Sequence, residues 1–128
     1  MTNLNYSYHI NLFFDNPIYF SSSMKRKAFF LDRDGVVIEE KHFLSDPQDV
    51  HLENGVLEFL HYLYELQMPV VIITNQSGIS RGFFNWHDYE KITARIINLI
   101  GKKNPIIGIF ANGLGPHSPV PGWRKPSP

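Results

Sequence analysis

The segment from Phe29 to Val37 constrains the fold of this chain more than any other stretch. An apolar run leads to Asp32 and Asp34, and Gly35 follows directly, where a glycine lets the backbone turn sharply. This pattern predicts a buried strand that ends in an acidic site. In open α/β sheets, ligands bind at the carboxyl ends of the strands, which is where both carboxylates would lie. An ordinary Asp-x-Asp-Gly turn at a strand end is the alternative interpretation.

The two carboxylates are close enough in sequence to repel each other unless a cation lies between them. Magnesium is the expected cation, because it prefers oxygen ligands and often binds through one or two carboxylates together with substrate phosphate. An aspartate beside such an ion can act as a nucleophile and form an aspartyl-phosphate. The second aspartate could then protonate the leaving oxygen and later activate water. The pair therefore indicates phosphoryl-transfer chemistry.

Composition narrows the class of protein. A chain of 128 residues is long enough for one domain with a single core. Lys+Arg and Asp+Glu both number 12, so no basic field indicates a nucleic-acid partner. The lack of cysteine excludes disulfides and cysteine-ligated zinc, and fits a reducing, cytoplasmic compartment. No apolar run approaches the roughly 20 residues that span a bilayer, so no membrane association is expected.

The N-terminal segment 1–23 contains no Lys or Arg and lacks the features of a targeting sequence. Its apolar stretches Leu12–Phe14 and Ile18–Phe20 could form short strands, but turn residues at 15–17 separate them. We expect residues 1–23 to be a peripheral extension that folding does not need. The functional domain is then expected over residues 24–128.

Strands and helices are expected to alternate through this domain. The expected elements are a strand at Lys27–Asp32, a helix at Gly55–Gln67 capped by Asn54, a strand at Val70–Ile73, a helix at Asn85–Ile100 with Asn85 and Asp88 as a capping pair, and a strand at Ile106–Phe110. The continuous β-branched run at Val70–Ile73 is typical of a parallel strand covered on both faces. A strand–helix–strand unit brings both strand ends to one edge of the sheet, so Thr74 and Asn75 should face Asp32 and Asp34.

Two further constellations could bind a phosphoryl group, which needs hydrogen-bond donors and positive charge around its oxygens. Thr74, Asn75 and Gln76, followed by Ser77-Gly78, could form a phosphate cradle or an ordinary polar turn. Arg81 could clamp a second anionic group, or could be a plain surface arginine. Lys125 could neutralise the transferred group, or belong to a frayed basic terminus.

These motifs together resemble the haloacid dehalogenase (HAD) superfamily of phosphatases, subfamily IIIA. Phe29–Val37 is similar to the first motif of that superfamily, Ile72–Gly78 to the second, and Arg124-Lys125-Pro126 to the third. The string from Thr74 to Gly82 is especially similar to the glycero-manno-heptose bisphosphate phosphatases and to histidinol-phosphatases. The resemblance covers the chain from about Lys25 to its end. It implies a Rossmann-like α/β fold with three α/β/α layers around a mainly parallel sheet.

The resemblance also implies a role for each motif residue. Asp32 would be the nucleophile, Asp34 the general acid/base, and Lys125 the charge-neutralising group. Thr74 and Asn75 would bind phosphate, and Gln76, Arg81 and Arg124 are further substrate-binding candidates. Magnesium would be held by both aspartates, that of Asp34 through its backbone carbonyl.

The chain departs from the pattern in two places. Heptose bisphosphate phosphatases usually carry a Cys/His zinc loop before the third motif, whereas residues 111–123 offer only His117, so no zinc is expected. The acidic fourth motif should follow Lys125 by some tens of residues, but the sequence ends first. We therefore expect a domain truncated after the third motif. The strand Lys27–Asp32 would then have an unpaired apolar edge that favours self-association.

The leading hypothesis is a magnesium-dependent phosphomonoester hydrolase acting on a small phosphorylated sugar or related metabolite, with a heptose bisphosphate as the model. One alternative is a polynucleotide 3′-phosphatase, a family with a similar Thr-Asn-Gln-x-Gly-Ile string. Balanced charge counts against it, because phosphate contacts dominate nucleic-acid affinity. A second alternative is a catalytically inactive remnant that only binds phosphate.

Overall fold

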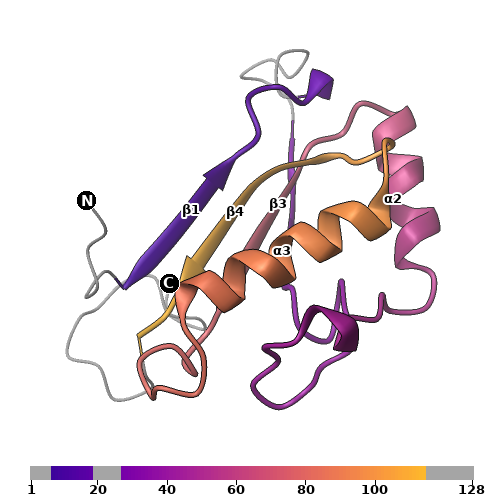
Figure 1. The fold of residues 1–128 in the computed structure, drawn as a ribbon. Helices are drawn as coiled ribbons and strands as arrows, with labels where there is room; N and C mark the ends of the chain where they lie inside the picture. Colours follow the sequence, from indigo (N-terminus) through magenta and orange to yellow (C-terminus); the bar gives the residue numbers. More distant parts are fainter. Residues whose placement is uncertain (1–6, 19–26, 115–128) are drawn as a thin grey trace.

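The computed structural model describes residues 7–18 and 27–114, which form a four-stranded sheet with two α-helices (Figure 1). The strands are β1 (Tyr8–Leu12), β2 (Phe29–Leu31), β3 (Val70–Asn75) and β4 (Ile106–Asn112). The helices are η1 (a 3₁₀ turn, Pro47–Asp49), α2 (Val56–Glu65) and α3 (Trp86–Ile100). The strand order is β1-β4-β3-β2, with β2, β3 and β4 parallel and β1 antiparallel to β4. The predicted α/β class with a mainly parallel sheet is confirmed.

The strand β1 comes from the N-terminal segment and pairs with β4 from Tyr8↔Asn112 to Leu12↔Gly108. Beyond it, the Asn16 side chain donates from Nδ2 to the carbonyls of Asn104 at 2.8 Å and Ile106 at 3.0 Å. Ile18 is only 2% exposed. The available edge of β4 needs backbone partners, and β1 supplies them. Part of the expected peripheral extension therefore belongs to the sheet. Its strand begins earlier than the predicted Leu12–Phe14.

Both helices lie close to their predicted bounds. The capping box of α3 is confirmed: Asn85 Oδ1 accepts from the Asp88 backbone N–H at 2.9 Å, and Asp88 Oδ2 accepts from the Asn85 N–H at 3.1 Å. The predicted cap of α2 is wrong, because Gly55 occupies the N-cap position with φ 81° instead of Asn54. The left-handed backbone there favours glycine over a residue with a side chain. Gly101 ends α3 as predicted.

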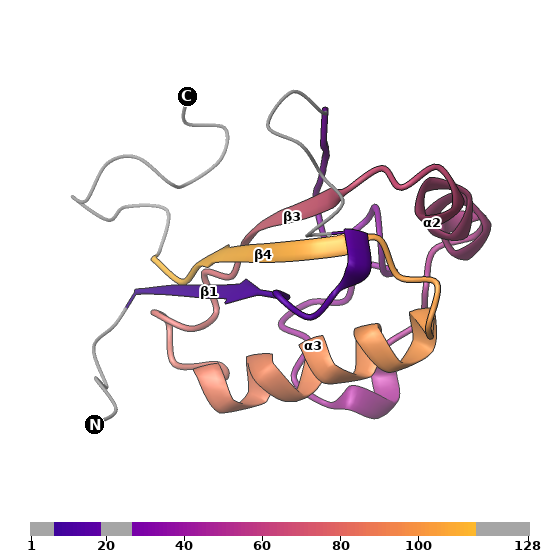
Figure 2. The ribbon, with the colours of Figure 1, turned by 90° about the horizontal axis from the view of Figure 1, so that it is seen from above.

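The strand β3 continues two residues beyond the predicted Ile73, because β4 runs beside it as far as Asn75↔Asn112. Val70 and Ile72 are buried in one core with the inner faces of α2 and α3, whereas Val71 and Ile73 are only half-buried. The prediction that both faces of this strand are covered is therefore wrong for the described residues. Figure 2 shows α3 on one side of the sheet, and the buried residues of α2 belong to the same core as those of α3. The described residues form two of the three expected layers.

The second face of the sheet exposes large apolar side chains. Ile10 is 49% exposed, Leu12 42% and Phe30 65%. Phe30 lies on β2, the edge strand opposite to β1. The expected self-association through this edge stays a prediction. Neither α2 nor α3, nor any other helix in the described ranges, is long and apolar enough to cross a membrane.

Candidate active site

The parallel strands β2, β3 and β4 end at one edge of the sheet, and this edge gathers most of the predicted site residues. Asp32 follows β2, Thr74 and Asn75 end β3, and all three line one cavity of about 150 Å³ together with Arg33 and Asp34. The side chain of Thr74 is buried, whereas Asp32 is exposed. The structure therefore brings together the two aspartates and the two residues predicted to bind phosphate.

A tight turn holds the acidic segment in place. The carbonyl of Arg33 accepts from the backbone N–H groups of Val37 at 2.9 Å and Ile38 at 3.0 Å, and the Gly35 N–H donates to the Ile38 carbonyl at 2.8 Å. Gly35 has φ 85°, a left-handed conformation that glycine adopts without steric cost. The glycine in the motif thus returns the chain toward the core directly after Asp34.

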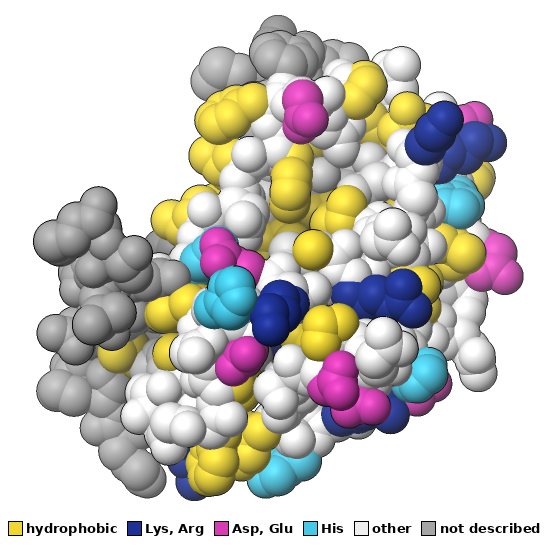
Figure 3. Space-filling model, viewed as in Figure 1, with side chains coloured by type: hydrophobic (Ala, Val, Ile, Leu, Met, Phe, Trp, Pro, Cys, Tyr) yellow, Lys and Arg dark blue, Asp and Glu magenta, His cyan; other side chains and the backbone are white. Residues whose placement is uncertain are grey.

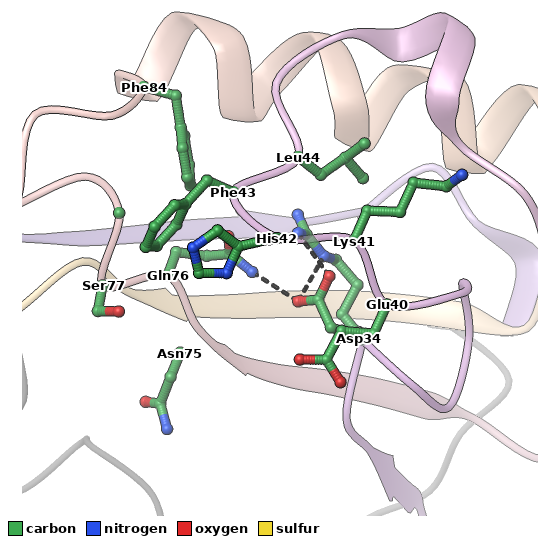
Figure 4. A pocket seen from close by; sticks show the side chains of 12 residues that line it. Asp34, Glu40, Lys41, His42, Phe43, Leu44, Asn75, Gln76, Ser77 and Phe84 are labelled. Carbon is green, nitrogen blue, oxygen red and sulfur yellow. Dashed lines mark hydrogen bonds and ion pairs between the residues drawn. The ribbon is translucent and has the colours of Figure 1, made fainter.

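The carboxylate of Asp34 is the centre of a hydrogen-bond network (Figure 4). The guanidinium of Arg33 donates from Nε to Oδ2 at 3.2 Å and from Nη2 to Oδ1 at 3.0 Å. Gln76 Nε2 donates to Oδ2 at 2.9 Å, and the Thr74 hydroxyl lies 3.4 Å from the same oxygen. Oδ2 therefore has three neighbouring donors, whereas Oδ1 accepts from Arg33. The orientation of this carboxylate is fixed by several side chains at once.

Gln76 connects the acidic segment to the ends of β3 and β4. Its side chain is buried and also donates to Thr74 Oγ1 at 2.8 Å. Its backbone N–H donates to the Asn112 carbonyl at 2.6 Å, so the segment after β3 is tied to the end of β4. The amide of Gln76 orients Asp34 and Thr74 in this structure. Its predicted contact with phosphate stays a prediction.

A second cavity of about 170 Å³ adjoins the first and shares Arg33, Asp34 and Asn75 with it. Two loops form its other walls, residues 40–44 and 76–78, together with Phe84. Figure 4 shows the carboxylate of Glu40 near that of Asp34, with His42 and Phe43 on the side of Gln76. The described chain therefore offers room beside Asp34 for a group larger than phosphate.

Aromatic side chains close the far side of this second cavity. The rings of Phe43 and Phe83 stack with centroids 4.2 Å apart and an interplanar angle of 12°. Arg81 Cζ lies 5.5 Å from the Phe43 centroid and 5.7 Å from that of Phe83, within the range of a cation–π contact. Phe43 has φ 51°, an unusual backbone conformation for a bulky residue. Arg81 thus lies at the aromatic pair, and the structure does not bring it to Asp34.

Arg33 is the residue that sequence reasoning missed. It is 3% exposed, and its Cζ lies 5.8 Å from the ring centroid of Tyr89 on α3. Burial raises the pKa of Tyr89 to about 12, an effect that the positive charge of Arg33 opposes. The available signal was a basic residue placed between the two aspartates, because a buried cation normally requires a carboxylate partner.

Three predicted residues lie outside the described ranges, namely His117, Arg124 and Lys125. Within those ranges, no group of three or more His, Cys, Asp or Glu side chains is arranged to hold a metal ion. The donor set at the strand ends nevertheless fits magnesium, since Asp32 and Asp34 line the same cavity and offer hard oxygen ligands. Side-chain donors already engage the Asp34 carboxylate, which is consistent with the expectation from sequence that Asp34 would hold the ion through its backbone carbonyl.

Comparison with known proteins identifies a matching family and several similar proteins. A family model described as polynucleotide kinase 3 phosphatase matches residues 27–128. The D-glycero-beta-D-manno-heptose-1,7-bisphosphate 7-phosphatase of Mesorhizobium japonicum is 32% identical over 108 residues, which is 79% of this chain and 50% of that protein. The protein of the same name from Helicobacter pylori is 34% identical over 106 residues, which is 80% of this chain and 60% of that protein.

Solved structures of phosphatases also resemble this chain. A structure from Mesorhizobium loti described as a HAD-like phosphatase matches with a TM-score of 0.78 and 28% identity, over 100% of this chain and 62% of that one. The D,D-heptose 1,7-bisphosphate phosphatase of B. bronchiseptica, complexed with magnesium and phosphate, matches with a TM-score of 0.74 and 31% identity, over 80% and 57% of the two chains. The chain thus spans about half to three fifths of the length of the curated relatives above.

Proposed function

We propose that this chain hydrolyses the phosphate monoester of a small phosphorylated sugar. The premise is that the chain belongs to the family of HAD-like phosphatases described as polynucleotide kinase 3 phosphatase. One observation carries the proposal: Asp32, Asp34, Thr74 and Asn75 line one cavity at the carboxyl ends of parallel strands. Curated relatives named heptose bisphosphate phosphatases support the choice of substrate class.

In the proposed reaction, a carboxylate oxygen of Asp32 attacks phosphorus, and the bond from phosphorus to the sugar oxygen breaks. Asp34 gives a proton to the leaving sugar oxygen. The resulting Asp34 carboxylate then takes a proton from water as that water attacks the aspartyl-phosphate, releasing inorganic phosphate and restoring Asp32. Thr74 and Asn75 donate hydrogen bonds to the phosphoryl oxygens, and Lys125 offsets their charge.

Magnesium is the proposed cofactor, held by the Asp32 carboxylate and by Asp34 through its backbone carbonyl. When bound, the ion would offset negative charge on the phosphoryl oxygens. A related structure that contains magnesium and phosphate supports this choice. Zinc is not proposed, because the chain has no cysteine. A cytoplasmic location also stays a prediction.

A substrate with a second anionic group is the preferred class within this proposal. Lys41 lines the second cavity, and Arg81 lies against its aromatic wall, so cationic groups are available beyond the reacting phosphate. A 3′-phosphorylated polynucleotide is the second candidate, because the matching family model is described by that activity. The balanced charge of the chain favours the small metabolite. Acidic and basic side chains are interspersed on the face seen in Figure 3.

The decisive experiment measures phosphate release, with added magnesium, from a heptose bisphosphate, histidinol phosphate and a 3′-phosphorylated oligonucleotide. We expect the heptose bisphosphate to have the highest kcat/KM, and Asp32→Asn to lose turnover by at least ~10³-fold, because the nucleophile is removed. The variant Asp46→Asn is a matched control, since Asp46 caps η1 instead of lining either cavity. Preference for the oligonucleotide would select the second candidate. Phosphate binding without turnover would indicate an inactive domain.

A further inference from the structure

We propose that Arg33 is a positioning residue, which holds the Asp34 carboxylate in the orientation that proton transfer from the attacking water requires. The inference rests on the proposed function and deepens it by assigning a role to a residue between the two aspartates. Arg33 does not need to contact substrate for this role. Its guanidinium acts through Asp34.

The first observation is the geometry of the ion pair. Arg33 donates to both oxygens of Asp34, at 3.2 Å from Nε and 3.0 Å from Nη2. Two parallel bonds from a planar guanidinium fix the plane of a carboxylate as well as its position. A lysine ammonium is a point charge on a flexible stem and cannot do this. The arrangement therefore needs arginine specifically.

The second observation is that the two Asp34 oxygens have different numbers of hydrogen-bond donors around them. Oδ2 is approached by Arg33 Nε, by Gln76 Nε2 at 2.9 Å and by Thr74 Oγ1 at 3.4 Å. Oδ1 is approached by Arg33 Nη2 at 3.0 Å, and among the described residues no other donor to it is found. A carboxylate oxygen has two lone pairs, so Oδ1 keeps one that can accept a proton from the attacking water. The pair with Arg33 thus assigns proton transfer to Oδ1.

The third observation is that Arg33 is itself held rigidly. Its side chain is 4% exposed, compared with 24% for that of Asp34. The Tyr89 ring lies 5.8 Å from Cζ, and Tyr89 packs against His9 at 5.2 Å and Trp86 at 5.2 Å. A buried cation costs free energy unless it is paired, so Arg33 stays with its carboxylate partner. The positioning device therefore extends from β1 and α3 to the catalytic edge.

A kinetic test compares Arg33→Met, Arg33→Lys and a matched control. We expect kcat to fall about 10- to 100-fold in both Arg33 variants, the effect of a misplaced catalytic group, while KM stays within about twofold. Lysine should not rescue, because it restores charge without the two parallel bonds. The control Arg95→Met changes an arginine on α3 that lines neither cavity, and should keep wild-type kcat. Wild-type kcat in Arg33→Met, or full rescue by lysine, would overturn the proposal.

A second measurement needs neither turnover nor a folded Arg33 variant. In ¹⁵N NMR spectra of the full chain, the Nε–H of Arg33 should exchange slowly with water, and Asp34→Ala should make that exchange fast. The control Asp46→Ala should leave it slow. Fast exchange in the wild-type protein, or no response to Asp34→Ala, would refute the ion pair. If no ester is hydrolysed by the wild-type chain, the proposed function fails, and the NMR result still decides the pairing of Arg33 with Asp34.

Discussion

Removal of residues 1–23 should destabilise the protein, because part of this segment belongs to the sheet. A chain that starts at Met24 loses β1 and with it the antiparallel partner of β4. It also loses Ile18, which is 2% exposed, and the two hydrogen bonds from Asn16 Nδ2 to the carbonyls of Asn104 and Ile106. These losses fall on the folded state, so the free energy of unfolding should decrease.

The size of the effect follows from those contacts. Burying an isoleucine side chain contributes about 1.5–3 kcal/mol, and each net hydrogen bond from Asn16 about 1 kcal/mol. The remaining ladder bonds of β1 are roughly offset by the entropy that its backbone regains, about 1–2 kcal/mol per residue. The net loss is therefore about 3–5 kcal/mol, a large share of the ~5–15 kcal/mol typical of a domain. At roughly 4 °C per kcal/mol, Tm should fall by about 12–20 °C.

Thermal and urea unfolding, followed by circular dichroism, would measure this loss for the full chain and for the chain starting at Met24. Two single substitutions calibrate the result. Ile18→Ala should cost about 2–5 kcal/mol because it opens a cavity, whereas Ile10→Ala should cost less than about 1 kcal/mol because that side chain is 49% exposed. A Tm within about 2 °C of the full chain after removal of residues 1–23 would refute the reasoning. That result would support the peripheral role that the sequence predicts for this segment.

Two further predictions concern the site and the core. A Cβ on Gly78 would lie 2.9 Å from Phe43 Cδ1 and closer still to Phe84, so Gly78→Ala should displace both of these cavity walls and raise KM several-fold. The exposed Ser80→Ala is the control. An unchanged KM in Gly78→Ala would show that the walls do not contact substrate. The pKa of Tyr89 is about 12 in the folded protein, compared with 10.0 for the free side chain. Between those pH values the unfolded chain releases this proton first. The free energy of unfolding therefore falls with rising pH, by about 1.4 kcal/mol per pH unit. Urea unfolding from about pH 9 to about pH 11 measures the slope, which Tyr89→Phe should reduce; an equal slope in that variant would contradict the assignment.

Much of the fold could be predicted because local signals were strong. The α3 helix has a capping box at its start and a glycine at its end, so the chain itself specifies both bounds. The strand β1 could not be predicted, since its pairing with β4 joins Tyr8 to Asn112, far apart in sequence. Its apolar residues are too few to distinguish an edge strand from a loop. Non-local pairing of this kind leaves little trace in a short window of sequence.

The role of Arg33 was hidden for a geometric reason. In a regular strand, side chains alternate between faces, so neighbours in sequence point apart and residues two apart point together. That rule predicts that Asp32 and Asp34 share a face and that Arg33 lies on the other. The strand β2 ends at Leu31, however, and the turn that follows uses the Arg33 carbonyl to accept from Val37 and Ile38. Once the backbone has left the strand, the Arg33 side chain can fold back onto the next residue. The motif spacing thus identifies the carboxylates, while the turn determines which neighbour orients them.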